Sequence, residues 1–474
     1  MKDKKIYIKL IQCLTVIVLY HITGKNSLFL YAITLSLYNI FLSCFSHISI
    51  KDKLKELNND YGKFKILKYT SLSIIIICLI LILLSILISD ITNMFLNIEN
   101  TFLPYLIMSI SIISEPLINL FLEYLESYNK PKLSNSLLNM YYIIENILFL
   151  IISILTIRII KLPIYISISL LYLSKILSFI IIASIIYITL KKQNIKIIKK
   201  DEVKKINYKY EIKEILKNNT SKSIINIIKN SYYYISIIIL YLVLSTRYSY
   251  NINTVEKDLT FVYLYGITLI KFLIDIVIYI TKQNQKKENI INYIYRVFQN
   301  MITIAITIGV TSPLICKIFF LNPNNAIYLT MLISLSIFII LFDITFKNIK
   351  NNKIIYISLI VGIISKLILI IPLINSFYRM GYNLIYGDII STIISISISI
   401  IINYIYLKIR NKQEKSLEKI LTTLYESILL SIILILFQFI IPINTESYFK
   451  SIIILIIYIS ISIIFVKVKK KKRG

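Results

Sequence analysis

The amino-acid sequence predicts an all-α polytopic membrane protein with about fourteen transmembrane helices, in two six-helix bundles followed by a C-terminal helix pair. Three observations predict this class. Hydrophobic residues make up 57% of the 474 residues and charged residues only 16%, unlike a soluble domain of this length. The mean hydropathy is +0.76. The apolar runs are about 20 residues long, which suits membrane helices, whereas barrel strands would be about half as long and would alternate.

Successive apolar segments follow one another along the chain, each bounded by polar or basic residues. The predicted spans cover approximately residues 6–22, 27–50, 66–89, 101–124, 136–159, 163–190, 222–245, 258–281, 291–320, 325–346, 353–376, 382–408, 417–441 and 447–467. Because this number of spans is even, we expect both ends of the chain on the same side of the membrane.

Connections that are rich in Lys and Arg alternate along the chain with connections that are poor in them. Rich ones include "KDKLKELNNDYGKFK" (51–65), "KNIKNNK" (347–353) and the tail "KVKKKKRG" (467–474), whereas "TGKN" (23–26) and "NPNN" (322–325) are poor. Cytoplasmic loops of membrane proteins carry the excess of Lys and Arg. We therefore expect both termini in the cytoplasm, and the net charge of +29 is explained by orientation rather than by nucleic-acid binding.

The longest connection between spans divides the chain unequally. It predicts an N-terminal six-helix bundle (1–190), a basic cytoplasmic linker (191–220), a C-terminal six-helix bundle (221–410), and two extra helices with a basic cytoplasmic tail (411–474). Two parallel bundles related by an axis along the membrane normal are a recurring plan of transporters.

Ionisable residues lie inside several predicted spans, where each costs about 2.5–3.5 kcal/mol and is a candidate for function. We expect a polar cavity between the bundles. The candidate substrate-binding residues are Glu115, Pro116, Glu145, Lys175, Lys271, Asp275, Arg296, Lys366 and Asp388. Two alternatives stay open: Arg296 is near a span end and could extend to the interface, and Lys271 and Asp275, four residues apart, could neutralise each other.

The fourth span contains Glu115 directly before Pro116, in "SIISEP" (111–116). A proline within a helix frees a backbone carbonyl one turn back, and such breaks in a span are tolerated where they line protein or water. We expect this pair to form a bent point that faces the cavity.

Motifs of bond-making chemistry are absent from the sequence. It contains no nucleophile–base constellation, no glycine-rich phosphate loop and no metal-ligand spacing. Its four cysteines all lie in apolar segments, as small buried residues do. We therefore expect a protein that binds and moves a substrate, with no enzymatic activity, no cofactor and no metal.

The topology, short loops and charged bundle faces resemble the multidrug/oligosaccharidyl-lipid/polysaccharide (MOP) exporter superfamily. "SIISEP" is similar to the Glu-Pro stretch in span 4 of the eukaryotic Rft family, the dolichol-linked oligosaccharide translocation proteins. "FLSCFSHISIKDKL" (41–54) lies where that family has a phenylalanine-led segment at the end of span 2, with Ser46-His47 in place of the usual Arg-Glu pair. The resemblance places Glu115 and Pro116 at the positions of the family's Glu-Pro pair in span 4.

This resemblance implies a role in flipping, or in assisting the flipping of, a dolichyl-pyrophosphate-linked oligosaccharide. The substrate would move from the cytoplasmic to the lumenal leaflet of the endoplasmic-reticulum membrane for N-glycosylation, by alternating access. The partners would be membrane lipid and this glycan or a similar polyprenyl-linked one. The ending "KKRG" (471–474) resembles a dilysine retrieval signal, although any basic cytoplasmic tail also satisfies the orientation rule.

Other functions remain open at this stage. The second candidate is a prokaryotic exporter of the same superfamily, in the plasma membrane, that moves a lipid-linked glycan. A cation-coupled drug antiporter normally has twelve spans. A membrane glycosyltransferase would need a large early outward loop with carboxylates, where this chain has only "TGKN" (23–26). A structural scaffold would not need charges at several membrane depths.

Overall fold

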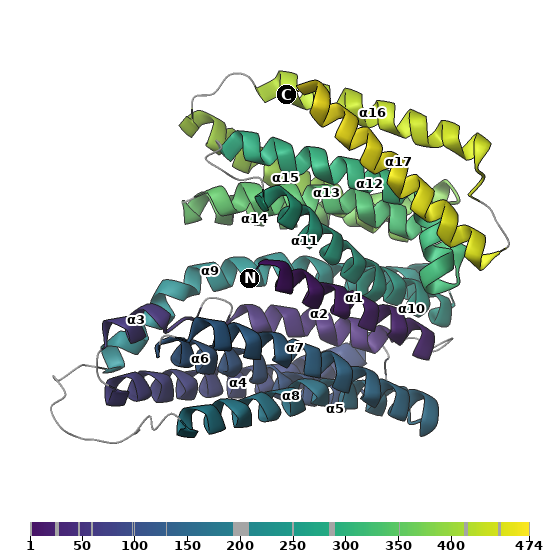
Figure 1. Ribbon diagram of the computed structural model, residues 1–474. Coiled ribbons are helices and arrows are strands. Elements are labelled where there is room, and N and C mark those ends of the chain that lie inside the picture. Colours follow the sequence, from purple (N-terminus) through teal and green to yellow (C-terminus); the bar gives the residue numbers. More distant parts are fainter. Residues whose placement is uncertain are drawn as a thin grey trace. The chain divides into compact units, whose positions relative to one another are not determined.

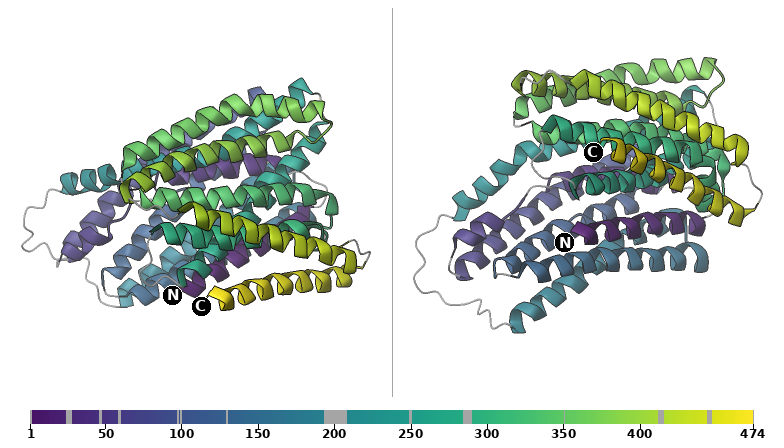
Figure 2. Two further views of the ribbon diagram at one scale, coloured as in Figure 1. Left: turned by 90° about the horizontal axis from the view of Figure 1, so that it is seen from above. Right: turned by 45° about the horizontal axis from the view of Figure 1, so that its top comes forward.

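The computed structural model of the protein is helical, with no strand among the residues that it describes (Figures 1 and 2). The described residues are 2–23, 28–45, 48–57, 60–96, 98, 100–128, 130–192, 208–248, 251–283, 290–349, 351–411, 416–443 and 447–473.

The chain forms two compact units, Asp3–Thr260 (unit 1) and Phe261–Gly474 (unit 2). The division falls within the eighth apolar segment, between Thr260 and Phe261. Residues 193–207 of the expected linker lie outside the described ranges. The bundle limits expected at residues 190 and 221 stay a prediction.

Unit 1 begins with apolar helices and contains the broken fourth span. Its elements are α1 (Lys2–Thr23), α2 (Phe29–Ser43), α3 (Lys51–Glu56), α4 (Asp60–Leu96), α5 (Phe102–Ser111), α6 (Ser114–Glu126), α7 (Pro131–Ser153), the π-helical turn η1 (Ile154–Ile159), α8 (Ile164–Lys192), α9 (Tyr208–Leu242), the π-helical turn η2 (Val243–Arg247) and α10 (Ile252–Thr260).

Unit 2 continues the same helix through a π-helical turn and ends with the basic C-terminal helix. Its elements are η3 (Phe261–Gly266), α11 (Ile267–Gln283), α12 (Ile290–Phe320), the 3₁₀ turn η4 (Pro323–Asn325), α13 (Ala326–Asn348), α14 (Asn352–Arg379), α15 (Ile385–Asn411), α16 (Ser416–Ile440) and α17 (Tyr448–Arg473).

The helices coincide with the predicted spans. Among the described residues, 11 helices are long and apolar enough to cross a membrane. Three shorter apolar helices, Ile8–Thr23, Phe29–Ser43 and Tyr425–Ile440, stand at the first, second and thirteenth predicted spans. The prediction of an all-α polytopic membrane protein is therefore confirmed.

The long helix α4 shows how these helices suit a lipid solvent. One face of the helix carries exposed large apolar side chains: Leu83 is 66% exposed and Leu87 is 62% exposed, whereas Ser85 and Ser89 are fully buried. Each buried serine donates a hydrogen bond to the carbonyl three residues earlier, at 2.8 Å. Small residues at helix contacts and large apolar residues outside are typical of membrane bundles, in which lipid replaces water around the fold.

Gly387 allows α14 and α15 to approach closely in unit 2. A Cβ atom at this position would lie 2.7 Å from the backbone nitrogen of Ile374 and 2.8 Å from its Cα. Gly309 on α12 is less constrained, because a Cβ there would meet only Thr330 Cγ2, at an ordinary 3.7 Å.

We expect Gly387→Ala to destabilise the protein by about 1–3 kcal/mol, because the added methyl group pushes against backbone atoms that have no side-chain freedom. The matched control, Gly309→Ala, should leave stability unchanged or raise it by up to about 1 kcal/mol through better helix propensity. Thermal unfolding of the two variants in detergent measures the difference. Equal melting temperatures would show that the close helix contact does not limit stability.

Candidate functional site

The fourth span is broken at the point where the sequence predicts a bend. Helix α5 ends at Ser111 and α6 begins at Ser114. Pro116 has no N–H to donate to the carbonyl of Ile112, one turn back. Between the two helices, the nitrogens of Ile112 and Ile113 donate to carbonyls three residues earlier, both at 3.3 Å, as in a 3₁₀ turn. Pro116 is buried and Glu115, beside it, is half-buried.

A charged cluster in unit 1 joins helices α2, α6, α7 and α8. Lys175 Nζ lies 2.5 Å from Glu145 Oε1 and 4.8 Å from the centre of the Tyr38 ring. Tyr142 donates a hydrogen bond to Glu115 Oε1 at 3.3 Å. Both side chains of the ion pair are about 15% exposed. The structure therefore brings three of the predicted site residues, Glu115, Glu145 and Lys175, into one neighbourhood.

Tyrosines cover the cation of this cluster. The ring of Tyr172 packs between those of Tyr31 and Tyr38, with centroid distances of 5.4 and 6.1 Å, and Tyr172 donates a hydrogen bond to Thr34 at 2.9 Å. The buried hydroxyl of Tyr38 has no hydrogen-bond partner among the described residues. A buried polar atom of this kind usually marks a place for water or a ligand.

A cavity of about 710 Å³ opens in unit 1 beside the break in the fourth span; we call it the acidic cavity. Its walls come from α2, α4, α6, α7 and α9. The polar and charged residues that line it are Asn39, Ser43, Ser49, Glu115, Asn119, Glu123, Glu126, Ser134, Asn135, Asn226, Lys229 and Asn230. The predicted residues Glu115 and Pro116 both belong to its wall.

The carboxylates of the acidic cavity are held in place by hydrogen bonds. Glu123 Oε2 accepts one from the backbone nitrogen of Ile50, at 2.7 Å. Glu126 Oε1 accepts one from the Ser134 hydroxyl, at 3.1 Å, and its Oε2 lies 2.7 Å from Lys51 Nζ. Carboxylates accept hydrogen bonds from hydroxyl groups, and amides both accept hydrogen bonds from them and donate to them. This lining suits a neutral polyhydroxyl ligand and disfavours a strongly anionic one.

The short basic helix α3 stands at the rim of the acidic cavity. Lys51 pairs with Glu126, as described above, and Lys53 pairs with Glu214 of α9 at 3.2 Å. The hydrogen bond to Glu126 raises the pKa of Lys51, so the Lys51 ammonium stays charged at neutral pH. Exposed ion pairs of this kind each contribute about 1 kcal/mol or less.

A second charged cluster lies in unit 2, between α14 and α15. Lys366 Nζ is 3.4 Å from Asp388 Oδ1 and donates a hydrogen bond to Thr392 Oγ1 at 2.7 Å. Tyr263 donates a short hydrogen bond to Asp388 Oδ2. Lys366 and Asp388 are 2% and 1% exposed. These two predicted site residues thus form one fully buried ion pair, directly after Gly387.

The other predicted site residues lie elsewhere. Lys271 is exposed and Asp275 is half-buried on α11, and Arg296 is half-buried on α12. None of the three lines a cavity described for unit 1. Ser46 and His47 lie outside the described residues, as do the side chains of the C-terminal lysines.

Sequence reasoning based on charge missed the amide lining of the acidic cavity. Asn39 on α2 and Asn230 on α9 lie close together. The Asn230 side chain donates a hydrogen bond to the backbone carbonyl of Asn39 at 3.3 Å and another to the Ser43 hydroxyl at 2.6 Å. Asparagine is common throughout this chain, which hides the few that line a site. The available signal was an asparagine within an apolar segment, as at Asn39 and Asn119.

No protein-family model matches the sequence, and no curated protein matches it. The fold, however, matches solved transporters. With a TM-score of 0.69 and 16% identity, it resembles the lipid II flippase MurJ in an inward closed conformation, over 99% of this chain and 98% of that one.

Other MOP-superfamily transporters also match. One from Pyrococcus furiosus gives a TM-score of 0.56 at 13% identity, over 86% of this chain and 94% of that one. A MATE transporter in complex with MaD3S gives 0.54 at 13% identity, over 86% and 95%. The chain therefore has the fold of MOP-superfamily flippases and transporters. The resemblance to the Rft branch still rests on "SIISEP" (111–116).

We expect Lys366→Met to destabilise the protein by about 3–5 kcal/mol, because it leaves the buried Asp388 carboxylate without its cation. The double variant Lys366→Met/Asp388→Asn should recover most of this loss, because no charge then remains in the pair. Unfolding free energies of the single and double variants in detergent measure the coupling.

The control for this cycle is the exposed pair Lys55 and Asp52, whose side chains are 62% and 95% exposed. Lys55→Met and Asp52→Asn should each cost about 1 kcal/mol or less, with little coupling. Additive losses at Lys366 and Asp388 would contradict the buried ion pair.

Proposed function

We propose that this protein translocates a lipid-linked glycan across the membrane by alternating access. The observation that carries the proposal is the full-length match to the lipid II flippase MurJ, over 99% of this chain. The matches to the other two transporters cover 86%.

The acidic cavity supports a glycan as the transported group. Its lining combines three glutamates, five asparagines and three serines with a single lysine. Sugars present many hydroxyl groups, and each hydroxyl is both a donor and an acceptor. Carboxylates accept from these hydroxyls, and amides both donate to them and accept from them. A volume of about 710 Å³ falls within the range of small-molecule sites and admits a few sugar rings rather than a long oligosaccharide.

The charges favour a division of the substrate between the cavity and the membrane surface. A pyrophosphate would be repelled by Glu115 and Glu123, so it would lie outside the acidic cavity, near the polar membrane surface. The polyprenyl tail needs no binding site, because it stays in lipid as the large apolar side chains on α4 do. The lysines Lys175 and Lys366 are each paired with a carboxylate, so they position the helices rather than bind phosphate.

Two substrates fit this function. The resemblance in "SIISEP" favours a dolichyl-pyrophosphate-linked oligosaccharide, moved to the lumenal leaflet of the endoplasmic reticulum for N-glycosylation, with both termini cytoplasmic. The likeness to a lipid II flippase favours a polyprenyl-linked glycan moved across a plasma membrane.

We expect Glu115→Gln to slow translocation about tenfold or more, because it removes the charge beside the helix break while it keeps the size of the side chain. The measurement uses proteoliposomes with a fluorescent polyprenyl-pyrophosphoryl disaccharide and a membrane-impermeant quencher. Asp90→Asn is the control, because Asp90 is exposed on α4 and does not line the acidic cavity. Wild-type rates for Glu115→Gln would refute the role of the acidic cavity.

Depletion of the protein in its host cell should cause a lipid-linked glycan that is assembled in the cytoplasm to accumulate. Mass spectrometry of extracted lipids identifies the carrier. A truncated dolichyl-pyrophosphate oligosaccharide supports the endoplasmic-reticulum substrate, and an undecaprenyl-linked precursor supports the plasma-membrane one. A normal profile of both would contradict translocation of a lipid-linked glycan.

A further inference from the structure

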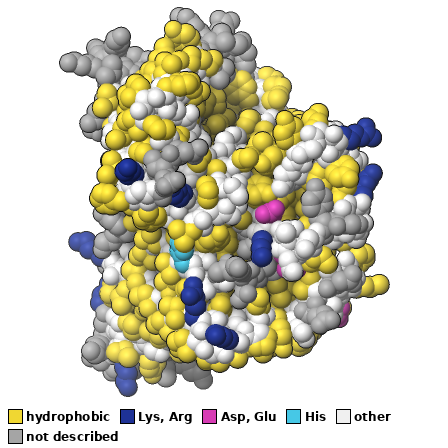
Figure 3. Space-filling view, turned by 90° about the vertical axis from the view of Figure 1, so that its right-hand side faces the viewer, with side chains coloured by type: hydrophobic (Ala, Val, Ile, Leu, Met, Phe, Trp, Pro, Cys, Tyr) yellow, Lys and Arg dark blue, Asp and Glu magenta, His cyan; other side chains and the backbone are white. Residues whose placement is uncertain are grey.

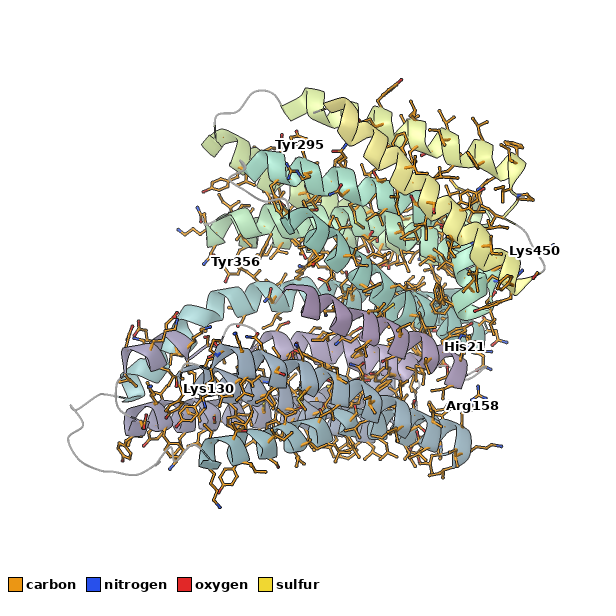
Figure 4. All side chains as sticks on the ribbon, viewed as in Figure 1. His21, Lys130, Arg158, Tyr295, Tyr356 and Lys450 are labelled. Atoms are coloured by element: carbon orange, nitrogen blue, oxygen red, sulfur yellow. The ribbon has the colours of Figure 1, made fainter. Side chains whose placement is uncertain are left out.

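A second cavity, of about 420 Å³, lies in unit 1 at the end opposite the acidic cavity. The helix α7 and the turn η1 connect the two: Ser134 near the start of α7 lines the acidic cavity, and Arg158 in η1 lines the second one. At 1.5 Å per residue these positions are about 35 Å apart, close to the thickness of a bilayer's hydrocarbon core. Figure 4 labels Lys130, just before α7, and Arg158 at opposite ends of this unit.

The charge of the second cavity is opposite to that of the first. Arg158 and Lys161 are its two cationic residues, and no Asp or Glu occurs among the described residues of its lining. Arg158 Nε donates to the carbonyl of Ile22 at 2.8 Å, and Nη2 donates a short hydrogen bond to the carbonyl of His21. These bonds use two of the five guanidinium N–H donors and fix the side chain against the last turn of α1.

Lysine and arginine are visible around this end of the unit. Figure 3 views the face on which Figure 4 labels His21 and Arg158, and it shows Lys and Arg side chains close to a histidine. The start of the 29-residue helix α8 also borders the second cavity, through Ile164 and Ser167. The positive end of its dipole adds to the attraction for an anion.

The remaining surroundings of the second cavity are apolar. Leu28, Leu162 and Ile164 contribute to its lining. Next to it, Ile159 is 65% exposed and Ile160 is 59% exposed, as expected for side chains that contact lipid tails. A ligand that satisfies both features has an anionic group for the two cations and a hydrophobic part for the surrounding surface. Free phosphate satisfies only the first.

We propose that the second cavity binds the phosphate of an anionic lipid headgroup, at the membrane face opposite the lysine-rich loops. The orientation rule places the excess of Lys and Arg in the loops of the other face, so it does not explain Arg158 and Lys161. Arginine donates to phosphate through its planar fork, and a nearby lysine adds a point charge. The proposal does not depend on the protein being a flippase.

The test uses the purified full-length protein in phosphatidylcholine nanodiscs. The probe is phosphatidic acid with a photoreactive acyl chain, and the cross-linked peptide is identified by mass spectrometry. The wild type should give a saturable cross-link near Ile157–Ile164. Arg158→Gln/Lys161→Gln should weaken binding about tenfold or more, as loss of charge-assisted hydrogen bonds predicts. Millimolar inorganic phosphate should not compete.

The control variant is Arg379→Gln/Lys450→Gln, which removes two exposed cations, at the end of α14 and the start of α17. It should bind the probe as the wild type does. Because Arg158 also caps α1, Lys161→Gln alone provides a variant that keeps this cap, and it should still weaken binding several-fold. The substitution is to glutamine rather than to glycine, because Lys161 has a φ of +56°. Glycine is favoured in this conformation and would change the backbone as well as the charge.

Three outcomes would overturn the proposal: a cross-link at the same position in the double variant with unchanged affinity, no saturable cross-link in the wild type, or competition by inorganic phosphate. The last would assign the cavity to a free anion. A failed translocation test at Glu115 leaves this result intact, because Glu115 lines only the acidic cavity.

Discussion

The cost of an unpaired polar group in hydrocarbon is the constraint on which the rest of this structure depends. Within the described spans, many serines bond to carbonyls of their own helix, as Ser85 and Ser89 do. Ionised residues are paired instead, as in Lys175 with Glu145 and Lys366 with Asp388. An isolated charge in this medium would cost several kcal/mol, so each buried cation requires a carboxylate on a neighbouring helix. The pairs therefore fix which helices lie together.

This pairing changes what the charges can do. A lysine that is already neutralised by a carboxylate attracts a phosphate weakly, so the buried cations are poor candidates for a pyrophosphate site. Recognition instead falls to amides, hydroxyls and the glutamates around the broken fourth span. The break itself follows from Pro116, which removes one hydrogen bond and opens the backbone where Glu115 lies. One proline thus connects a local backbone defect to the largest described cavity of unit 1.

The two ends of unit 1 differ in charge, and the charge of each cavity is opposite to that of the loops at the same end. The lysine-rich loops belong to the end that has the acidic cavity, where Lys51 and Lys53 pair with carboxylates across elements. The end with few lysines in its loops holds Arg158 and Lys161 beside apolar, exposed isoleucines. Net loop charge sets the orientation of a chain in the membrane, but the local partners of each charge set the chemistry of a site.

The helical membrane class, the position of the apolar segments and the broken fourth span could all be predicted from the sequence. These depend on hydropathy, periodicity and one proline, all of which are local along the chain. Glu115, Glu145, Lys175, Lys366 and Asp388 also stood out as charges within apolar segments, where charges are rare. The folded structure was needed to see that Lys175 pairs with Glu145, that Lys366 pairs with Asp388, and that asparagines from α2, α6, α7 and α9 share a wall. Those contacts join residues 22 to 191 positions apart, and they depend on helix packing that no local pattern encodes.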